Sequence, residues 1–278
     1  MGKLIIFGHR GMLGHVLQAR TQAEGFDLPE CDITDRKTVL DLVQSRRPEI
    51  IINCAAFTQV DAAEAAEEKA TRINGVAVGY LAEAAREVDA YFLTISTDYV
   101  FPGEGETPYK EDDPVGPQCA YGRSKLAGEE AVRSVGGRWA IARTQWLYGQ
   151  GGKNFIDTIA RLGKEKESLK VVNDQVGAPT WTVDLTEMLI ALTNNQAQGI
   201  YHTANSGYAS WYEVASLIIA ELGLPCKIIP CTSAEYPLPA KRPNNSRLNL
   251  DKITALMGKL PRPWQLAVRE YLRLRIGN

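Results

Sequence analysis

Short apolar runs alternate along the first half of the chain with longer segments whose apolar positions recur at helical spacing. The apolar runs lie at 4–7, 26–28, 49–56, 91–95 and 138–143, and the helical segments lie at 15–24, 36–47, 61–88 and 121–133. Apolar strands that alternate with amphipathic helices are typical of a parallel sheet covered by helices on both faces. The pattern therefore predicts an α/β fold with a doubly wound parallel sheet.

The pattern is less regular after about residue 145. Helical spacing returns at 154–166, 183–193 and 210–222, and apolar runs lie at 169–173 and 200–204. We predict two domains, a first over 1–148 and a smaller second that is mainly 149–278. Segments within about 170–205 are expected to return to the sheet of the first domain.

Three glycines follow the first apolar run directly. Gly8, Gly11 and Gly14 form a G-x-x-G-x-x-G pattern that ends a predicted strand and opens a helix. Glycines there permit a tight turn and a close approach of the backbone to a pyrophosphate, and the helix N-terminus offers it free N–H groups. The first domain is therefore predicted to be a Rossmann-like dinucleotide-binding domain.

Residues beside the glycine turn refine this prediction. Arg10 lies inside the turn, and a guanidinium beside the adenosine ribose suits a 2′-phosphate, which favours NADPH and leaves NADH as the alternative. Asp27 lies close to the position of a ribose-binding acid. Cys54, Ala55 and Ala56 end the third apolar run, and their small side chains leave room for a nicotinamide ribose.

The candidate chemistry lies in the segments STDYVF at 96–101 and YGRSK at 121–125. Tyr121 and Lys125 are four positions apart in a predicted helix, so their side chains share one face. A nearby ammonium favours the phenolate, and we expect it to lower the pKa of Tyr121. Thr97 is expected at the carboxyl edge of a strand, where its hydroxyl can hold the substrate oxygen that Tyr121 protonates.

Composition argues against several other classes of function. The chain has 278 residues, a net charge of −2 and no dense Lys/Arg stripe, so we expect no nucleic-acid partner. No apolar run approaches the length of a membrane span and no signal peptide precedes the first strand, so we expect a cytoplasmic protein without a membrane contact. The cysteines lack metal-ligand spacing, so we expect reduced thiols and no metal site. They are Cys31, Cys54, Cys119, Cys226 and Cys231.

With these elements in place, the chain resembles the extended short-chain dehydrogenase/reductase superfamily and, within it, the dTDP-4-dehydrorhamnose reductase family. The glycine pattern and the Tyr/Lys pair are typical of the superfamily as a whole. The narrower resemblance extends over nearly the whole chain and rests on the segments at 53–61, 96–103, 121–129, 143–148, 173–180 and 242–248.

The resemblance implies roles for individual residues. The catalytic residues would be Thr97, Tyr121 and Lys125. The cofactor would be lined by Gly8, Gly11, Met12, Leu13, Asp32, Ile33, Ala55, Ala56 and Thr58, to which the residue pattern adds Arg10, Gly14 and Cys54. The substrate would be contacted by Thr97, Asp98, Tyr99 and Trp146 at the sugar and by Gln175 and Arg242 toward the nucleotide.

The resemblance also implies an activity. NADPH or NADH would reduce the carbon-4 ketone of a nucleotide-linked 6-deoxy-4-keto sugar, dTDP-4-dehydro-L-rhamnose, to give dTDP-L-rhamnose for cell-surface polysaccharides. Sugar-nucleotide dehydratases have an acid where this chain has Tyr99, and GDP-fucose synthases have a cysteine where it has Asp98. Another 4-ketoreductase, an epimerase and a non-catalytic cofactor-binding regulatory subunit remain as alternatives.

Some members of the family are metal-bridged homodimers. Val16 occupies the position of one bridging acid, so the metal site is not expected here. A homodimer without the metal stays open.

Overall fold

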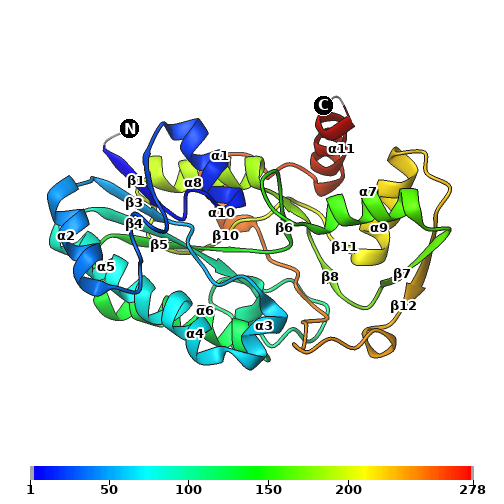
Figure 1. Cartoon of the computed structure of the whole chain (residues 1–278), viewed down its shortest axis with the longest axis horizontal. Helices are drawn as coiled ribbons and strands as arrows, with labels where there is room; N and C mark the ends of the chain where they lie inside the picture. The colour runs from blue at the N-terminus through cyan, green and yellow to red at the C-terminus, as the bar shows by residue number, and fades with distance from the viewer. Residues whose placement is uncertain (1–2, 277–278) are drawn as a thin grey trace.

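The computed structural model describes residues 3–276, and its centre is a six-stranded sheet (Figure 1). The strands lie in the order β10-β5-β4-β3-β1-β2, and every neighbouring pair is parallel. Their bounds are β1 Leu4–Phe7, β2 Glu24–Phe26, β3 Ile50–Asn53, β4 Tyr91–Thr97, β5 Trp139–Thr144 and β10 Gly199–His202. The predicted α/β class with a parallel sheet is confirmed.

Helices cover both faces of this sheet (Figure 1). One face packs against α1 (Met12–Thr21), α8 (Thr182–Asn194) and α10 (Asp251–Met257). The other packs against α2 (Arg36–Arg46), α5 (Ala77–Glu87) and α6 (Ala120–Val135). The central strands β1 and β3 are buried along their whole length, as expected of parallel strands between two helical layers.

The alanine-rich stretch at 61–88 is not the single helix that its pattern predicts. It divides into α3 (Val60–Ala65), α4 (Glu67–Thr71), a π-helical turn η1 (Arg72–Val76) and α5. Within the π turn the Asn74 amide accepts a hydrogen bond from the Phe57 N–H at 2.8 Å and donates to Ser124 Oγ at 2.9 Å. The turn therefore holds the loop after β3 against α6, and such π turns often occur at functional sites.

The second half of the chain forms its own hydrophobic cluster. It contains α7 (Phe155–Glu165), α9 (Trp211–Glu221) and α11 (Trp264–Ile276) around the parallel pair β7 (Ser168–Val172) and β12 (Lys227–Cys231). Two shorter pairs join β6 (Leu147–Tyr148) to β9 (Thr180–Trp181) and β8 (Val176–Gly177) to β11 (Ala209–Ser210). Two 3-10 turns, η2 (Asp98–Val100) and η3 (Ser233–Glu235), complete the elements. Within residues 3–276, no helix combines the length and apolarity that crossing a bilayer requires.

The two halves are connected at several places. α8 and β10 pack on the first sheet, and β10 pairs with β5. A later segment returns too, because the Asn245 N–H donates to the Gly103 carbonyl at 2.9 Å and the Tyr109 N–H donates to the Arg247 carbonyl at 2.9 Å. These returns place residues from near the C-terminus directly behind the end of β4.

Candidate active site

The carboxyl ends of the parallel strands open into one cavity of about 1240 Å³. Most of the residues expected at the cofactor and the sugar line it. They are Gly8, Gly11, Met12, Leu13, Gly14, Asp32, Ile33, Cys54, Ala55, Ala56, Thr58, Thr97, Asp98, Tyr99, Tyr121, Lys125 and Trp146. Ligands of open parallel sheets bind at this edge.

The glycine turn forms one end of the cavity. Gly8 has a φ of +77°, and a Cβ atom there would lie 2.4 Å from the backbone nitrogen of Ala55. A Cβ atom on Gly14 would lie 2.2 Å from the Gly8 carbonyl oxygen. The backbone of α1 therefore lies so close to the glycine turn that only glycine fits at this position. α1 begins at Met12 with no side-chain cap and no acid in its first turn, so its N–H groups suit an anionic pyrophosphate.

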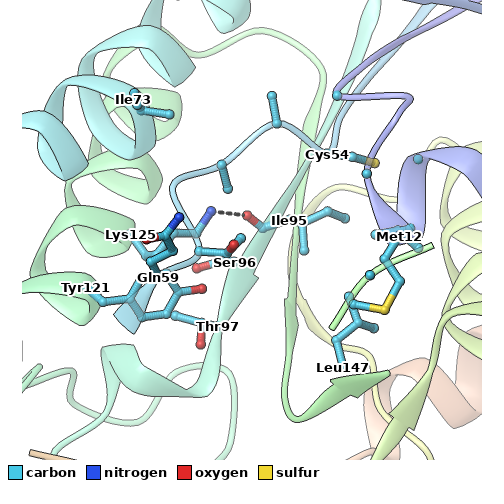
Figure 2. A pocket seen from close by; sticks show the side chains of 18 of the residues that line it. Met12, Cys54, Gln59, Ile73, Ile95, Ser96, Thr97, Tyr121, Lys125 and Leu147 are labelled. Carbon is cyan, nitrogen blue, oxygen red and sulfur yellow. Dashed lines mark hydrogen bonds between the residues drawn. The ribbon is translucent and has the colours of Figure 1, made fainter. Parts of the chain in front are cut away.

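Thr97, Tyr121 and Lys125 lie together at the other end of the cavity, across from Met12 and Leu147 (Figure 2). Thr97 is the last residue of β4. Tyr121 and Lys125 lie in the first two turns of α6, whose N-cap is Cys119. The Lys125 ammonium donates a hydrogen bond to the Ile95 carbonyl oxygen at 2.7 Å.

The electrostatics of this trio differ from the expectation. Burial, followed by the charge of Asp98, raises the pKa of Tyr121, and hydrogen bonding with Thr97 opposes the rise. The expected lowering by Lys125 is wrong, because the ammonium is directed at the Ile95 carbonyl. Burial also lowers the pKa of Lys125 to about 8, although the Glu129 carboxylate acts in the opposite direction.

A chain of hydroxyl and carboxyl groups continues from Thr97. Its Oγ1 donates to Asp98 Oδ1 at 3.0 Å and accepts from the Tyr99 N–H at 3.3 Å. Ser246, from the returning C-terminal segment, donates to Asp98 Oδ2 at 2.5 Å. Asp98 is 2% exposed, and burial raises its pKa to about 6 against the effect of these hydrogen bonds.

A buried ion pair supports the strand ends from behind. Glu129 and Arg143 are each 1% exposed and form two hydrogen bonds, at 2.8 and 2.7 Å. Ser96 donates to the same Glu129 carboxylate at 2.6 Å. The pair therefore fixes β4 and β5 against α6 one turn beyond Lys125.

Aromatic side chains form another part of the cavity wall. Trp146 stacks on Trp211 with ring centroids 3.6 Å apart, and both line the cavity. Tyr99 meets Tyr121 edge to face at 5.5 Å. Trp211, at the start of α9, was not predicted as a site residue, although its N-cap Ser210 marked the helix start.

Three predicted residues do not line the cavity. Arg10 forms an ion pair with Glu30 and donates to the Leu28 carbonyl. Gln175 donates to Ser233 Oγ at 2.8 Å. Arg242 makes a bidentate pair with Asp61, at 2.9 and 2.8 Å. Their predicted ligand contacts remain predictions.

The cavity also includes cations that the sequence analysis did not select. Lys69 lies on α4 and Arg72 lies in the π turn. Lys153 follows Gly151 and Gly152 in the loop between β6 and α7. Their only sequence signal is a basic residue near a glycine or on a polar helix face, which is too common to indicate a site. Within residues 3–276 no group of three or more His, Cys, Asp or Glu side chains is placed to hold a metal ion.

Comparison with known proteins gives consistent matches over the whole chain. A family model described as "RmlD substrate binding domain" matches residues 2–275. The spore coat polysaccharide biosynthesis protein SpsK of Bacillus subtilis is 41% identical over 280 residues, covering 99% of this chain and 98% of that protein. The dTDP-4-dehydrorhamnose reductase of Escherichia coli is 39% identical over 290 residues, covering 97% and 96%. The structure of a Bacillus anthracis dTDP-4-dehydrorhamnose reductase in complex with NADP is 38% identical, has a TM-score of 0.94 and covers 98% of both chains.

Proposed function

The chain belongs to the RmlD substrate-binding domain family, and on this premise we propose that it reduces dTDP-4-dehydro-L-rhamnose to dTDP-L-rhamnose with NADPH. It is an NAD(P)H-dependent oxidoreductase with a parallel α/β core. The observation that supports this activity best is the position of Thr97, Tyr121 and Lys125, which share one cavity with the glycine turn at the N-terminus of α1.

The residues at the glycine turn fit a dinucleotide. The close approach at Gly8 and the uncapped start of α1 provide a flat cradle and free N–H donors for its pyrophosphate. Ala55, Ala56 and Lys125 lie along the path from that cradle to Tyr121, where the nicotinamide ribose would lie. When bound, the dinucleotide supplies the hydride.

The protein residues then handle the proton and the charge. Tyr121 donates its phenolic proton to the oxygen that develops negative charge at carbon 4. Lys125 favours the phenolate that remains, because a neighbouring ammonium stabilises it. Thr97 hydrogen-bonds the same oxygen, which is the usual way to stabilise a developing alkoxide.

We relate the choice of dinucleotide to two side chains, Arg10 in the glycine turn and Asp27 directly after β2. Asp27 lines the cavity and suits a ribose 2′-hydroxyl, as in NADH. Arg10 suits the 2′-phosphate of NADPH and forms an ion pair with Glu30. We assign NADPH as the cofactor and keep NADH as the alternative.

The substrate would occupy the wall opposite the glycine turn. Asp98, Tyr99 and Trp146 line the cavity together with Tyr121, so we keep them as the residues that recognise the sugar, Asp98 by way of Thr97. We keep Gln175 and Arg242 as contacts toward the nucleotide, which would require both side chains to leave their present partners.

Three further assignments belong to this proposal. We place the boundary between a dinucleotide-binding domain and a mainly substrate-binding domain at 148/149, with segments within about 170–205 returning to the first sheet. A cytoplasmic location fits the five free thiols of the described residues. A homodimer stays a prediction that the mass in solution tests.

The deciding experiment is NADPH oxidation in the presence of dTDP-, GDP- or UDP-linked 4-keto-6-deoxy sugars, repeated with NADH. We expect one NADPH oxidised per sugar reduced, with the dTDP substrate preferred. An epimerase would interconvert sugars without net oxidation, and a regulatory subunit would bind the cofactor and oxidise none of it.

A further inference from the structure

The hydrogen bonds of the Thr97 hydroxyl conflict with its proposed task. A threonine hydroxyl has one proton and two lone pairs. The Thr97 hydroxyl donates its hydrogen bond to Asp98 Oδ1 at 3.0 Å. One of its lone pairs accepts a hydrogen bond from the Tyr99 N–H at 3.3 Å. Only one lone pair is left. In this arrangement Thr97 can accept a hydrogen bond from Tyr121 but cannot donate one to a substrate oxygen.

The reduction nevertheless gains from a second donor at that oxygen. Negative charge develops on the oxygen while the transfer of the Tyr121 proton is still incomplete. A second donor that faces the same atom stabilises this charge. Thr97 can be that donor if the hydrogen bond between it and Asp98 is reversed, which requires a proton on Asp98.

The surroundings of Asp98 permit that proton. The side chain is 2% exposed, lies in the cavity wall and forms no ion pair with any residue in the described range 3–276. Asp98 Oδ2 accepts a hydrogen bond from the Ser246 hydroxyl. Ser246 is itself 1% exposed, and its backbone N–H donates to the Val176 carbonyl. A carboxyl group that is buried without a counter-ion favours its neutral form.

The titratable neighbours of Asp98 come from three elements. Tyr121 on α6 and Tyr99 on η2 both feel the charge of Asp98, which raises their pKa values. Cys119, at the start of α6, and Arg242, in the returning C-terminal segment, act electrostatically on Tyr99. Burial raises the pKa of Asp98 to about 6, whereas burial places the pKa of Lys125 at about 8 and raises that of Cys119.

We infer that Asp98 is protonated in the reacting complex and donates a hydrogen bond to Thr97, which frees the Thr97 hydroxyl to donate to the substrate oxygen. Asp98 is then a positioning residue that acts through Thr97, and Ser246 sets how readily it gains the proton. The proton comes from solvent and stays on Asp98 while Tyr121 protonates the sugar. This inference rests on the proposed reductase activity.

The test compares the pH dependence of kcat in the wild type and two variants, at saturating NADPH and dTDP-4-keto-6-deoxy sugar. The wild type should lose activity as the pH rises and Asp98 ionises, by about tenfold per pH unit beyond the apparent pKa. Asp98→Asn carries a permanent amide donor, so this loss of activity, the high-pH limb of the profile, should vanish. Only a limb from the titration of Lys125 at higher pH should remain. Ser246→Ala removes a hydroxyl that favours the carboxylate, so the wild-type limb should move to higher pH.

The control is Ser216→Ala, whose hydroxyl bonds only the Tyr212 carbonyl of its own helix α9, and it should keep the wild-type profile. NADPH affinity measured on each variant reports whether the cavity is intact. The inference is overturned if Asp98→Asn retains the wild-type limb, or if it only raises the KM for the sugar, as a direct sugar contact would. If Asp98→Asn does not fold, an unshifted limb in Ser246→Ala overturns it. A wild-type protein that oxidises no NADPH at any pH would overturn the reductase activity itself.

Discussion

The ammonium nitrogen of Lys125 lies 2.7 Å from the carbonyl oxygen of Ile95, so helix α6 is joined directly to the strand that ends in Thr97. The Lys125 side chain is also buried, since it is 5% exposed. A ligand that offers ribose hydroxyls to this ammonium would compete with the Ile95 carbonyl. The Ile95 carbonyl therefore helps to fix the position of Lys125.

Replacing Tyr121 with phenylalanine should remove the proton donor and leave the packing unchanged. General acid catalysis is typically worth about 100-fold to 10,000-fold, so kcat should fall by about that factor while NADPH affinity stays near the wild-type value. Stopped-flow NADPH oxidation and cofactor titration measure the two quantities. Tyr208→Phe is the control, because the Tyr208 hydroxyl bonds the Leu248 carbonyl away from the cavity. Near wild-type turnover in Tyr121→Phe would remove this residue from the mechanism.

Lys125→Met should change the pH dependence of stability in a defined direction. The pKa of Lys125 in the folded protein, about 8, lies below its ordinary value of 10.5. The unfolded state therefore binds more protons between those values, and wild-type stability should rise relative to the variant as the pH increases from 8 toward 10.5. The limit is about 3 kcal/mol, at 1.36 kcal/mol per unit of pKa.

Urea unfolding at pH 7 and pH 10 measures this difference. Lys252→Met is the control for loss of a lysine-to-carbonyl hydrogen bond, since Lys252 is exposed and donates to the Ile200 carbonyl at 2.6 Å. A stability difference between the wild type and Lys125→Met that stays constant over this range would show that the ammonium is not desolvated.

Gly8→Ala should destabilise the protein and abolish dinucleotide binding. The new Cβ atom would lie 2.4 Å from the Ala55 nitrogen, and the residue would keep a φ of +77°. Gly223→Ala is the matched control, because it has a φ of +60° and nothing within 4 Å of the new atom. Backbone strain should cost both variants about 1–2 kcal/mol, and the overlap should cost Gly8→Ala a further ~1–3 kcal/mol.

Urea midpoints and NADPH titration separate these contributions. Equal destabilisation of the two glycine variants, with cofactor affinity retained in both, would contradict the close approach of β1 and the loop after β3.

The pair of Arg242 and Asp61 should couple the C-terminal segment to α3. A double-mutant cycle of Arg242→Ala and Asp61→Ala should give a coupling free energy of unfolding of about 1 kcal/mol, since the pair is bidentate but partly exposed. Arg242 lowers the pKa of Asp61, so the coupling should be present above the unfolded pKa and lost as the pH falls through the folded one.

The exposed pair of Arg161 and Glu165 is the reference for this cycle. Steady-state kinetics on the same variants distinguish a structural role of Arg242 from a role in binding the sugar nucleotide. If Arg242 also contacts the nucleotide, Arg242→Ala should raise the KM for the sugar nucleotide more than Asp61→Ala does. Equal KM values in the two variants would restrict Arg242 to its structural role.

Local signals predicted much of the fold. The helices expected at 36–47 and 210–222 are present as α2 and α9, which Asp35 and Ser210 cap with side-chain hydrogen bonds, and the central strands follow their apolar runs. The strand β12 was missed because Pro230 interrupts its pattern, which is tolerated since β12 pairs only with β7. The π turn at Asn74 was missed because the surrounding alanines fit one continuous helix equally well.

The candidate site was predictable where neighbouring positions share one element. Tyr121 and Lys125 lie on one helix, and the glycines lie in one turn. The stack of Trp146 on Trp211 and the hydrogen bond from Ser246 to Asp98 join residues far apart in the chain, so no spacing rule indicates them. The pKa of Tyr121 was predicted with the wrong sign because burial and the charge of Asp98 both raise it, and only the tertiary structure defines both effects.

The strand β10 borders β5 and belongs to the chain beyond residue 148. A fragment that stops at 148 would expose the N–H and C=O groups of β5, and bare sheet edges recruit other chains. One half of the chain therefore cannot be exchanged between relatives without the other. A chimera between relatives has to transfer α8, β10 and the segment around Ser246 together with the sheet and the Asp98 side chain that they contact.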